Sequence, residues 1–168
     1  MAKSAKRESR DLLVLNGPNL NLLGKRQPEI YGRDTLDDIA ASVTARAKDF
    51  GLSVDFRQSN HEGHLVTWVQ EARDPTGATG ARAIIINPGG LSHTSVALLD
   101  ALIFTELPVI EVHLSNIHRR ETFRHHSFVS SAAAGVIVGL GPQGYLLAVD
   151  AAANILKAAK SKTKKRPA

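Results

Sequence analysis

The sequence has 168 residues, no cysteine and a formal net charge of +5 at pH 7. Its length gives room for one domain with a core of its own, and the lack of cysteine excludes a disulfide framework, a thiolate metal site and a cysteine nucleophile. The basic excess lies in residues 1–10 and 157–168, which leaves 15 acidic and 11 basic residues in the body, so the charge does not indicate a nucleic-acid partner.

Five short apolar runs predict five β-strands. Four of the runs are continuous, which is typical of strands buried in a parallel sheet, and the second one alternates, which favours a place nearer an edge. In chain order the predicted strands are Leu12–Leu15, the segment LSVDFRQS from Leu52, Ala83–Ile86, Val109–Val112 and Val136–Leu140.

Helical patterns lie between these runs. Apolar residues recur at helical spacing over Leu36–Phe50. Thr35 and Asp38 are placed as a capping box before this helix, and Gly51 is placed to end it. Because strands and helices alternate, the sequence predicts an α/β fold with helices on both faces of a parallel sheet. The other predicted helices lie around Leu65–Val69, ending near Asp74, over Thr94–Thr105 and over Tyr145–Ala159.

The pattern indicates a single domain over residues 11–156. Its interior has no internal repeat and no linker, and DPTGATG at 74–80 is interpreted as a surface connection. Residues 1–10 are expected to form a flexible basic extension, and residues 157–168 a disordered basic tail. The first ten residues lack the apolar core of a signal peptide, and no later run reaches the roughly 18 apolar residues of a membrane span, so we expect a cytoplasmic protein without membrane association.

Polar segments follow the strands. In an open parallel sheet, ligands bind beyond the carboxyl ends of the strands, where such segments meet. Amide, imidazole, guanidinium and phenol groups would converge there, which favours a pocket for a small, oxygen-rich anion over a protein interface. The side chains concerned are Asn19, Arg26, Tyr31, Asn87, His93, His113, Ser115, Arg120 and Arg124.

One of these segments, Asn19–Gly32, is unusually long. A strand and a helix are usually connected by roughly 2–6 residues, and longer connections are often lids or binding loops. Because the segment carries Arg26 and Tyr31, it is interpreted as a lid that brings both side chains to a bound ligand.

Three long signatures resemble type II 3-dehydroquinate dehydratase, namely LNGPNLNLLGKRQPEIYG, INPGGLSHTSVALLDAL and IEVHLSNIHRRETFRHHS. They occur in order over Leu12–Leu156, together with RQSNHEG and VIVGLGPQGYLLA. The resemblance implies a flavodoxin-like, doubly wound fold, a dodecamer built as a tetramer of trimers, and no metal or organic cofactor. It also implies the reversible anti dehydration of 3-dehydroquinate to 3-dehydroshikimate through an enolate, a step of the shikimate pathway. Gln27 departs from the pattern, since many members of the family have glutamate there.

The resemblance assigns catalytic roles to five residues. Dehydration of a β-hydroxy ketone needs a base, a group that stabilises the enolate, and an acid for the departing water. Tyr31 is the expected base, and because a phenol has an ordinary pKa of about 10, Arg26 is expected to stabilise its charged form when the lid closes. Asn19 is expected to orient a water at the enolate oxygen. His113 is the expected acid, and Glu111, two residues earlier on the same strand face, is its expected orienting partner.

The resemblance also assigns the substrate-binding residues. The substrate carboxylate is expected to bind Asn87 and two backbone N–H groups, and the ring hydroxyls an imidazole and a guanidinium. One further cation is expected to support the lid, and one aspartate to reach into the site of a neighbouring subunit. The two backbone N–H groups are those of Leu114 and Ser115, the imidazole is that of His93 and the guanidinium that of Arg124. The cation that supports the lid is Arg120, and the aspartate is Asp100.

Other motifs and a second function compete with this hypothesis. GLGPQG matches the dinucleotide pattern G-x-G-x-x-G, but no later strand supplies the acidic residue that should follow. Ser92 lacks the G-x-S-x-G elbow of a hydrolase, and the four histidines between 113 and 126 match no familiar metal-ligand spacing. The alternative function is a flavodoxin-like module that binds a small anion without turnover, for which an activated phenol would be unnecessary.

Overall fold

The computed structural model describes residues 10–24, 34–74 and 80–164. Within these ranges, five parallel strands form one sheet in the order β2-β1-β3-β4-β5. The predicted parallel sheet is confirmed, and its strand order is that of flavodoxin-like folds. The strands are β1 (Leu12–Asn16), β2 (Val54–Gln58), β3 (Ala83–Asn87), β4 (Val109–His113) and β5 (Gly135–Val138).

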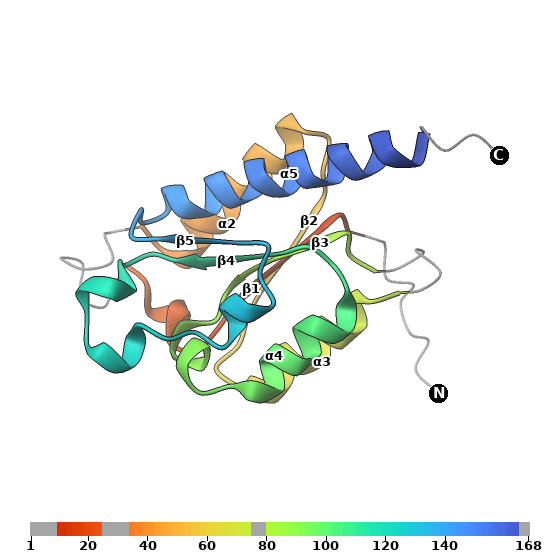
Figure 1. Cartoon of the computed structure of the whole chain (residues 1–168). Helices are drawn as coiled ribbons and strands as arrows, with labels where there is room; N and C mark the ends of the chain where they lie inside the picture. Colours follow the sequence, from red (N-terminus) through yellow and green to blue (C-terminus); the bar gives the residue numbers. More distant parts are fainter. Residues whose placement is uncertain (1–9, 25–33, 75–79, 165–168) are drawn as a thin grey trace, which may run out of the picture.

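Helices cover both faces of the sheet, as predicted. Figure 1 shows α2 and α5 on one face and α3 and α4 on the other. Five short 3-10 helices, η1 to η5, lie in the connections of the described chain. The bounds are α2 (Leu36–Asp49), α3 (Glu62–Ala72), α4 (Val96–Thr105), α5 (Gln143–Lys164), η1 (Leu20–Leu22), η2 (Gly89–His93), η3 (Ile117–Arg119), η4 (Thr122–Arg124) and η5 (Val129–Ser131).

The start of α2 has the predicted capping box. The Thr35 hydroxyl oxygen accepts a hydrogen bond from the Asp38 backbone N–H at 3.2 Å, and the Asp38 carboxylate accepts one from the Thr35 N–H at 2.9 Å. These bonds satisfy backbone donors that the first turn of a helix leaves unpaired. Gly51 has a φ of 67° and follows the end of the helix, as its residue type predicts.

The core consists of two apolar clusters, one on each face of the sheet. Successive side chains of a strand point to opposite faces, so β1 contributes Leu12 and Val14 to one cluster and Leu13 and Leu15 to the other. All five residues of β1 are buried. The continuous apolar run that predicts this strand therefore reflects its burial from both sides.

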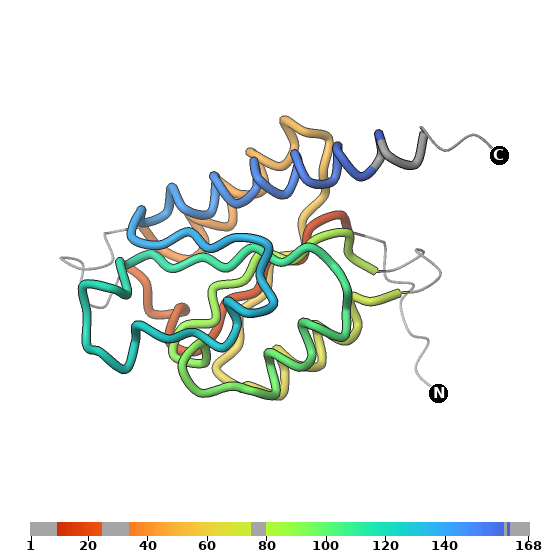
Figure 2. The backbone as a smooth tube through the Cα atoms, viewed as in Figure 1, coloured from red at the N-terminus to blue at the C-terminus, as the bar shows by residue number. Residues whose placement is uncertain are grey.

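The chain segments that follow β1, β3 and β4 gather at one end of the sheet (Figure 2). The Gly17 N–H donates to the Asn87 carbonyl oxygen at 2.8 Å, which ties the first two of these segments together. A Cβ atom at Gly17 would lie 2.2 Å from the Pro88 carbonyl oxygen, so a larger residue would separate them.

Two expectations about the carboxyl-terminal part are wrong in detail. The strand expected at Val136–Leu140 begins at Gly135 and ends at Val138, because Gly139, with a φ of 83°, turns the chain away. Its apolar run predicts burial, yet β5 is an edge strand and Val136 is 44% exposed. The tail expected to be disordered from residue 157 is helical as far as Lys164, since it continues α5 with alanine and lysine, which are good helix formers.

Of the helices in the described ranges, none combines the length and the apolar composition that crossing a membrane requires.

Candidate active site

A cavity of about 250 Å³ opens at the carboxyl ends of β1, β3 and β4. It is lined by the segments that follow these strands, together with η3 and η4. This is the place where an open parallel sheet is expected to bind a ligand. The predicted site residues that line it are Asn19, Asn87, His93, His113, Leu114, Ser115, Arg120 and Arg124.

Two predicted site residues, Glu111 and Asp100, are absent from the cavity lining, and two more cannot be placed relative to it. Glu111 is completely buried on β4 and reaches the site through His113. Asp100 lies exposed on α4, away from the cavity lining. Arg26 and Tyr31 lie outside the described residues.

His113 and Glu111 form a buried pair at the end of β4. The Nε2 atom of His113 lies 2.7 Å from a Glu111 carboxylate oxygen, and the two residues are 5% and 0% exposed. The two-residue spacing on one strand places both side chains on the same face, as the sequence predicts. Because an ionised carboxylate only accepts hydrogen bonds, Nε2 carries the proton of this bond and Nδ1 is the nitrogen that can serve a ligand in the cavity.

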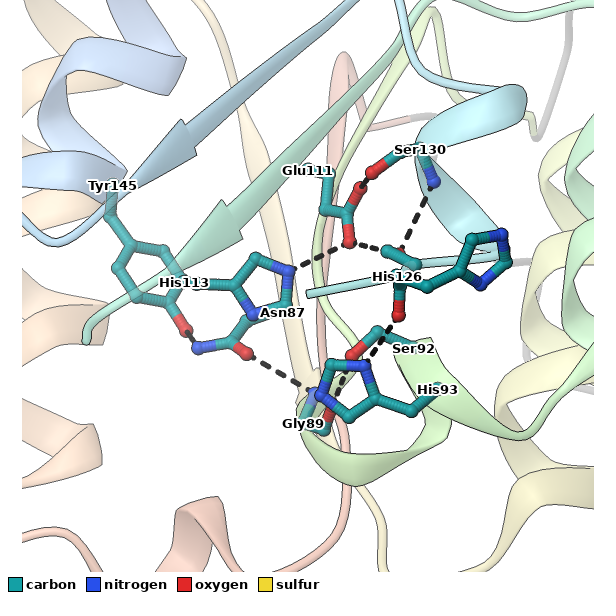
Figure 3. Close-up of polar contacts among 10 residues, drawn as sticks. Asn87, Gly89, Ser92, His93, Glu111, His113, His126, Ser130 and Tyr145 are labelled. Carbon is teal, nitrogen blue, oxygen red and sulfur yellow. Dashed lines mark hydrogen bonds and ion pairs between the residues drawn. The ribbon is translucent and has the colours of Figure 1, made fainter. Parts of the chain in front are cut away.

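The Glu111 carboxylate accepts two further hydrogen bonds. The Ser127 hydroxyl donates to one oxygen at 2.6 Å, and the Ser130 hydroxyl donates to the other. Figure 3 shows the carboxylate between the His113 ring and Ser130. Burial alone would raise the pKa of Glu111, but the hydrogen bonds from His113, Ser127 and Ser130 outweigh it and hold that pKa below its ordinary value. Glu111 is therefore a charged acceptor behind His113.

Asn87 is held by a second buried network at the end of β3. Its Nδ2 donates to the Tyr145 hydroxyl at 2.9 Å, and its Oδ1 accepts from the Gly89 N–H at 3.2 Å. The Tyr145 hydroxyl in turn donates to Asn16 Oδ1 at 2.6 Å. Burial raises the pKa of Tyr145, so its hydroxyl stays protonated and donates. The remaining Nδ2 hydrogen is what Asn87 can offer to a ligand.

His93 is oriented by a backbone carbonyl. Its Nδ1 lies 2.7 Å from the carbonyl oxygen of His126 (Figure 3). Because a carbonyl only accepts, Nδ1 carries a proton and Nε2 is the nitrogen left for the cavity. The neighbouring Ser92 is buried and donates to the Gly89 carbonyl oxygen at 2.5 Å, so the two do not form a nucleophile and base pair.

Two arginines on the rim share an exposed partner. Glu121 accepts from Arg124 Nε at 2.9 Å and lies 3.4 Å from Arg120 Nε. Its side chain is 54% exposed, whereas the arginines are 27% and 23% exposed. Ion pairs with an exposed carboxylate contribute little, so Glu121 competes only weakly with an anionic ligand for these cations.

Asn19 has a left-handed backbone conformation, with a φ of 69°. Its N–H donates to Asn60 Oδ1 at 2.9 Å, and the Gln58 amide donates to the same oxygen at 3.1 Å. Non-glycine residues with positive φ are uncommon and persist where neighbours hold them. The link to the β2–α3 connection therefore holds the backbone of Asn19 in this conformation at the cavity.

Several supporting residues escaped the sequence reasoning. Ser127 is the last residue of the third long signature and Ser130 lies three residues beyond it, but their spacing from Glu111 carries no recognisable pattern. Asn60 lies in RQSNHEG, which marks a polar strand end without indicating its contact. A hydroxyl within the apolar pattern of the last helix is the signal that could have drawn attention to Tyr145.

The dinucleotide motif is not part of this cavity. GLGPQG connects β5 to α5, and its residues are absent from the lining. Among the described residues, no group of three or more histidine, aspartate or glutamate side chains is arranged to hold a metal ion.

Comparison with known proteins agrees with the site. A family model described as "Dehydroquinase class II" matches residues 10–153. The chain is 60% identical over 145 residues to a 3-dehydroquinate dehydratase of Caulobacter sp. (strain K31), covering 86% of this chain and 95% of the relative. It is 57% identical over 147 residues to that of Corynebacterium glutamicum (strain R), covering 87% and 97%. The crystal structure of type II dehydroquinase from Propionibacterium acnes matches with a TM-score of 0.80 at 45% identity, over 88% of this chain and 99% of that one. The chain therefore belongs to the class II dehydroquinase family of enzymes.

Proposed function

We propose that this enzyme dehydrates 3-dehydroquinate to 3-dehydroshikimate in the shikimate pathway, with His113 as the general acid. The observation that carries the proposal is the buried pair of His113 with a charged Glu111, which leaves Nδ1 as the ring nitrogen for the cavity. Membership in the class II dehydroquinase family supports the substrate.

The chemistry needs one base, one acid and a stabilised enolate. A base removes a proton from the carbon beside the ketone, and the electron pair moves onto the ketone oxygen. When the enolate oxygen re-forms the carbonyl, the electrons of the enolate carbon–carbon double bond form a double bond between the α- and β-carbons and expel the β-hydroxyl. The hydroxyl takes the His113 Nδ1 proton and leaves as water, so that the product is a conjugated enone.

Glu111 makes His113 suited to this step. With both nitrogens protonated, the ring is positive, and the adjacent carboxylate at 2.7 Å stabilises that charge. After the Nδ1 proton is delivered, the ring is left as the Nε2–H tautomer that Glu111 already holds. The ring therefore need not turn during the reaction.

The rest of the cavity matches the remaining groups of the substrate. In the proposal, the carboxylate binds the free Asn87 amide hydrogen and the backbone N–H groups of Leu114 and Ser115. The ring hydroxyls bind His93 Nε2 and Arg124, and Arg120 supports the closed lid. These residues line one cavity, which supports a shared ligand.

The base is proposed from the sequence. Tyr31 removes the proton, Arg26 stabilises its phenolate, and Asn19 orients a water at the enolate oxygen. The left-handed backbone of Asn19 and its bond to Asn60 support a fixed role for this side chain. The arginine is proposed to act from the lid, where exclusion of water strengthens its attraction to the phenolate.

The assembly is proposed as a dodecamer of four trimers in the cytoplasm. Asp100, exposed on α4, would reach a neighbouring subunit's site. Ile103 and Phe104 on the same helix are 56% and 54% exposed, and apolar side chains of this size favour a covered surface.

The test mixes the purified protein with 3-dehydroquinate and follows the ultraviolet absorbance of the conjugated enone. The wild-type chain should produce it, and the Tyr31→Phe variant should produce very little. Calorimetry with the same substrate separates the alternative, because a module that only binds the anion would give heat of binding without enone. Folded wild-type protein that gives no enone would overturn the proposed function.

A further inference from the structure

We propose that residues 126–130 form a positioning segment that sets which ring nitrogen each of the two cavity histidines presents to the substrate. The role of each ring nitrogen towards the substrate rests on the proposed function, whereas the hydrogen bonds that fix the two tautomers do not depend on it. The segment contacts His113 through Glu111 and contacts His93 directly. Its serines are positioning residues, since they act through Glu111 rather than on the substrate.

The segment reaches His113 through the Glu111 carboxylate. Ser127 Oγ lies 2.6 Å from Glu111 Oε1, and Ser130 Oγ bonds Oε2, so both carboxylate oxygens are held. The Ser130 N–H donates to Ser127 Oγ at 3.4 Å, which directs the Ser127 hydroxyl hydrogen towards Glu111. A carboxylate held at both oxygens has one orientation, and in it Oε1 faces His113 Nε2. His113 is therefore restricted to presenting Nδ1.

The segment contacts His93 directly. The His126 carbonyl accepts from His93 Nδ1 at 2.7 Å, so His93 presents Nε2. The Phe128 N–H donates to the carbonyl oxygen of Ser92 at 2.8 Å, which fixes the segment to the residue before His93. The two histidines are therefore held in opposite tautomers by one stretch of chain. One ring offers Nδ1 and the other offers Nε2.

The segment is rigid enough for this task. Val129 is 0% exposed and belongs to the apolar cluster that includes Leu98 and Leu102 of α4. Ser127 is 8% exposed. A segment anchored by a buried side chain and by backbone bonds keeps its polar groups in place when substrate enters.

The kinetic test compares Ser127→Ala and Ser130→Ala with two controls. Ser130→Thr keeps the hydroxyl, and Ser131→Ala changes an exposed serine of the same 3-10 helix. Each alanine variant of the segment should lower kcat about 10- to 100-fold, the scale of one hydrogen bond to a charged group, with KM within about twofold. The threonine variant should recover most of the loss, and Ser131→Ala should match the wild type.

The structural test uses nitrogen-15 NMR of the histidine rings at a pH where they are neutral. The wild type should show His113 protonated on Nε2 and His93 on Nδ1. The Ser127→Ala, Ser130→Ala double variant should show mixed tautomers for His113 and an unchanged His93. Folded alanine variants with unchanged tautomers and unchanged kcat would overturn the inference. It would also be overturned if these variants had a lower Tm as their only change. A wild type without turnover would instead count against the proposed function and leave the NMR result to decide the segment.

Discussion

The inner wall of the cavity and its rim are built differently. On the inner wall, Asn87 and His113 lie at strand ends, are 3% and 5% exposed, and have buried partners, among them Glu111, which lies behind His113. On the rim, the arginines 120 and 124 lie in or beside 3-10 helices and share an exposed glutamate. Groups that must place a proton within hydrogen-bond distance are thus held by the sheet, whereas the groups that attract charge lie on connections outside it, beside an exposed glutamate.

The physical reason is the environment of each contact. A hydrogen bond to a buried charge cannot be replaced by water, so it fixes geometry and its loss is expensive. An exposed ion pair competes with water and salt and contributes little. Substitutions on the inner wall should therefore affect turnover strongly, and substitutions on the rim weakly.

His113→Ala should show the largest effect. Removal of the proposed general acid is expected to lower kcat about 10²- to 10⁴-fold, the usual contribution of such a group. His118→Ala is the control, because His118 is exposed on η3 and outside the cavity lining. The enone assay measures both variants, and equal kcat values would remove His113 from the mechanism.

Glu111→Gln should lower kcat less, about 10- to 100-fold, because the ring remains but loses the charge that stabilises its protonated form. KM should change little, since Glu111 does not line the cavity. A kcat equal to that of the wild type would mean that the inner wall does not depend on this carboxylate.

The same substitution should change the pH dependence of stability. The pKa of Glu111 is lowered in the folded protein from its ordinary 4.5. Its contribution to the free energy of unfolding is therefore present above the unfolded pKa and is lost as the pH falls through the lower, folded pKa. Melting curves below pH 5 should show Tm falling more steeply in the wild type than in Glu111→Gln. Parallel curves would contradict the charged state of Glu111.

Asn60→Ala should produce a moderate effect at the boundary of the two regions. Loss of the acceptor at 2.9 Å frees the Asn19 N–H, and kcat should fall about two- to tenfold, the scale of a neutral hydrogen bond. Asn60→Asp keeps an acceptor oxygen and should stay near the wild type. If both variants behave alike in the enone assay, the bond to Asn19 is unimportant.

Glu121→Ala should have the smallest effect. It removes the shared partner of two rim arginines, and KM should change by no more than about fivefold, with kcat and Tm near those of the wild type. A loss of kcat as large as that of Glu111→Gln would erase the proposed difference between rim and wall.

Much of the framework could be predicted from local patterns. The capping box of Thr35 and Asp38 and the buried run of β1 are contained in short windows of sequence, and both occur as predicted. The shared face of Glu111 and His113 follows from the two-residue period of a strand. The edge position of β5 was not predictable in the same way, because an apolar run does not reveal whether a neighbouring strand or helix covers it.

The supporting contacts of the site required the fold. Tyr145 bonds Asn16 and Asn87, which are 129 and 58 residues away in the chain, and no local period relates them. Asn60 reaches Asn19 over 41 residues in the same manner. Their residue types allow many partners, so a hydroxyl or an amide alone does not identify the one it bonds.

By itself, the sequence determined the alternation of strands and helices, the family resemblance and the polar strand ends that meet in one cavity, because each is recorded in residue type and spacing. Only the tertiary structure decided which nitrogen of His113 and of His93 faces that cavity. The reason is that a ring's tautomer depends on the acceptor packed against its other side, and for both rings packing supplies that acceptor from Glu111 and the positioning segment.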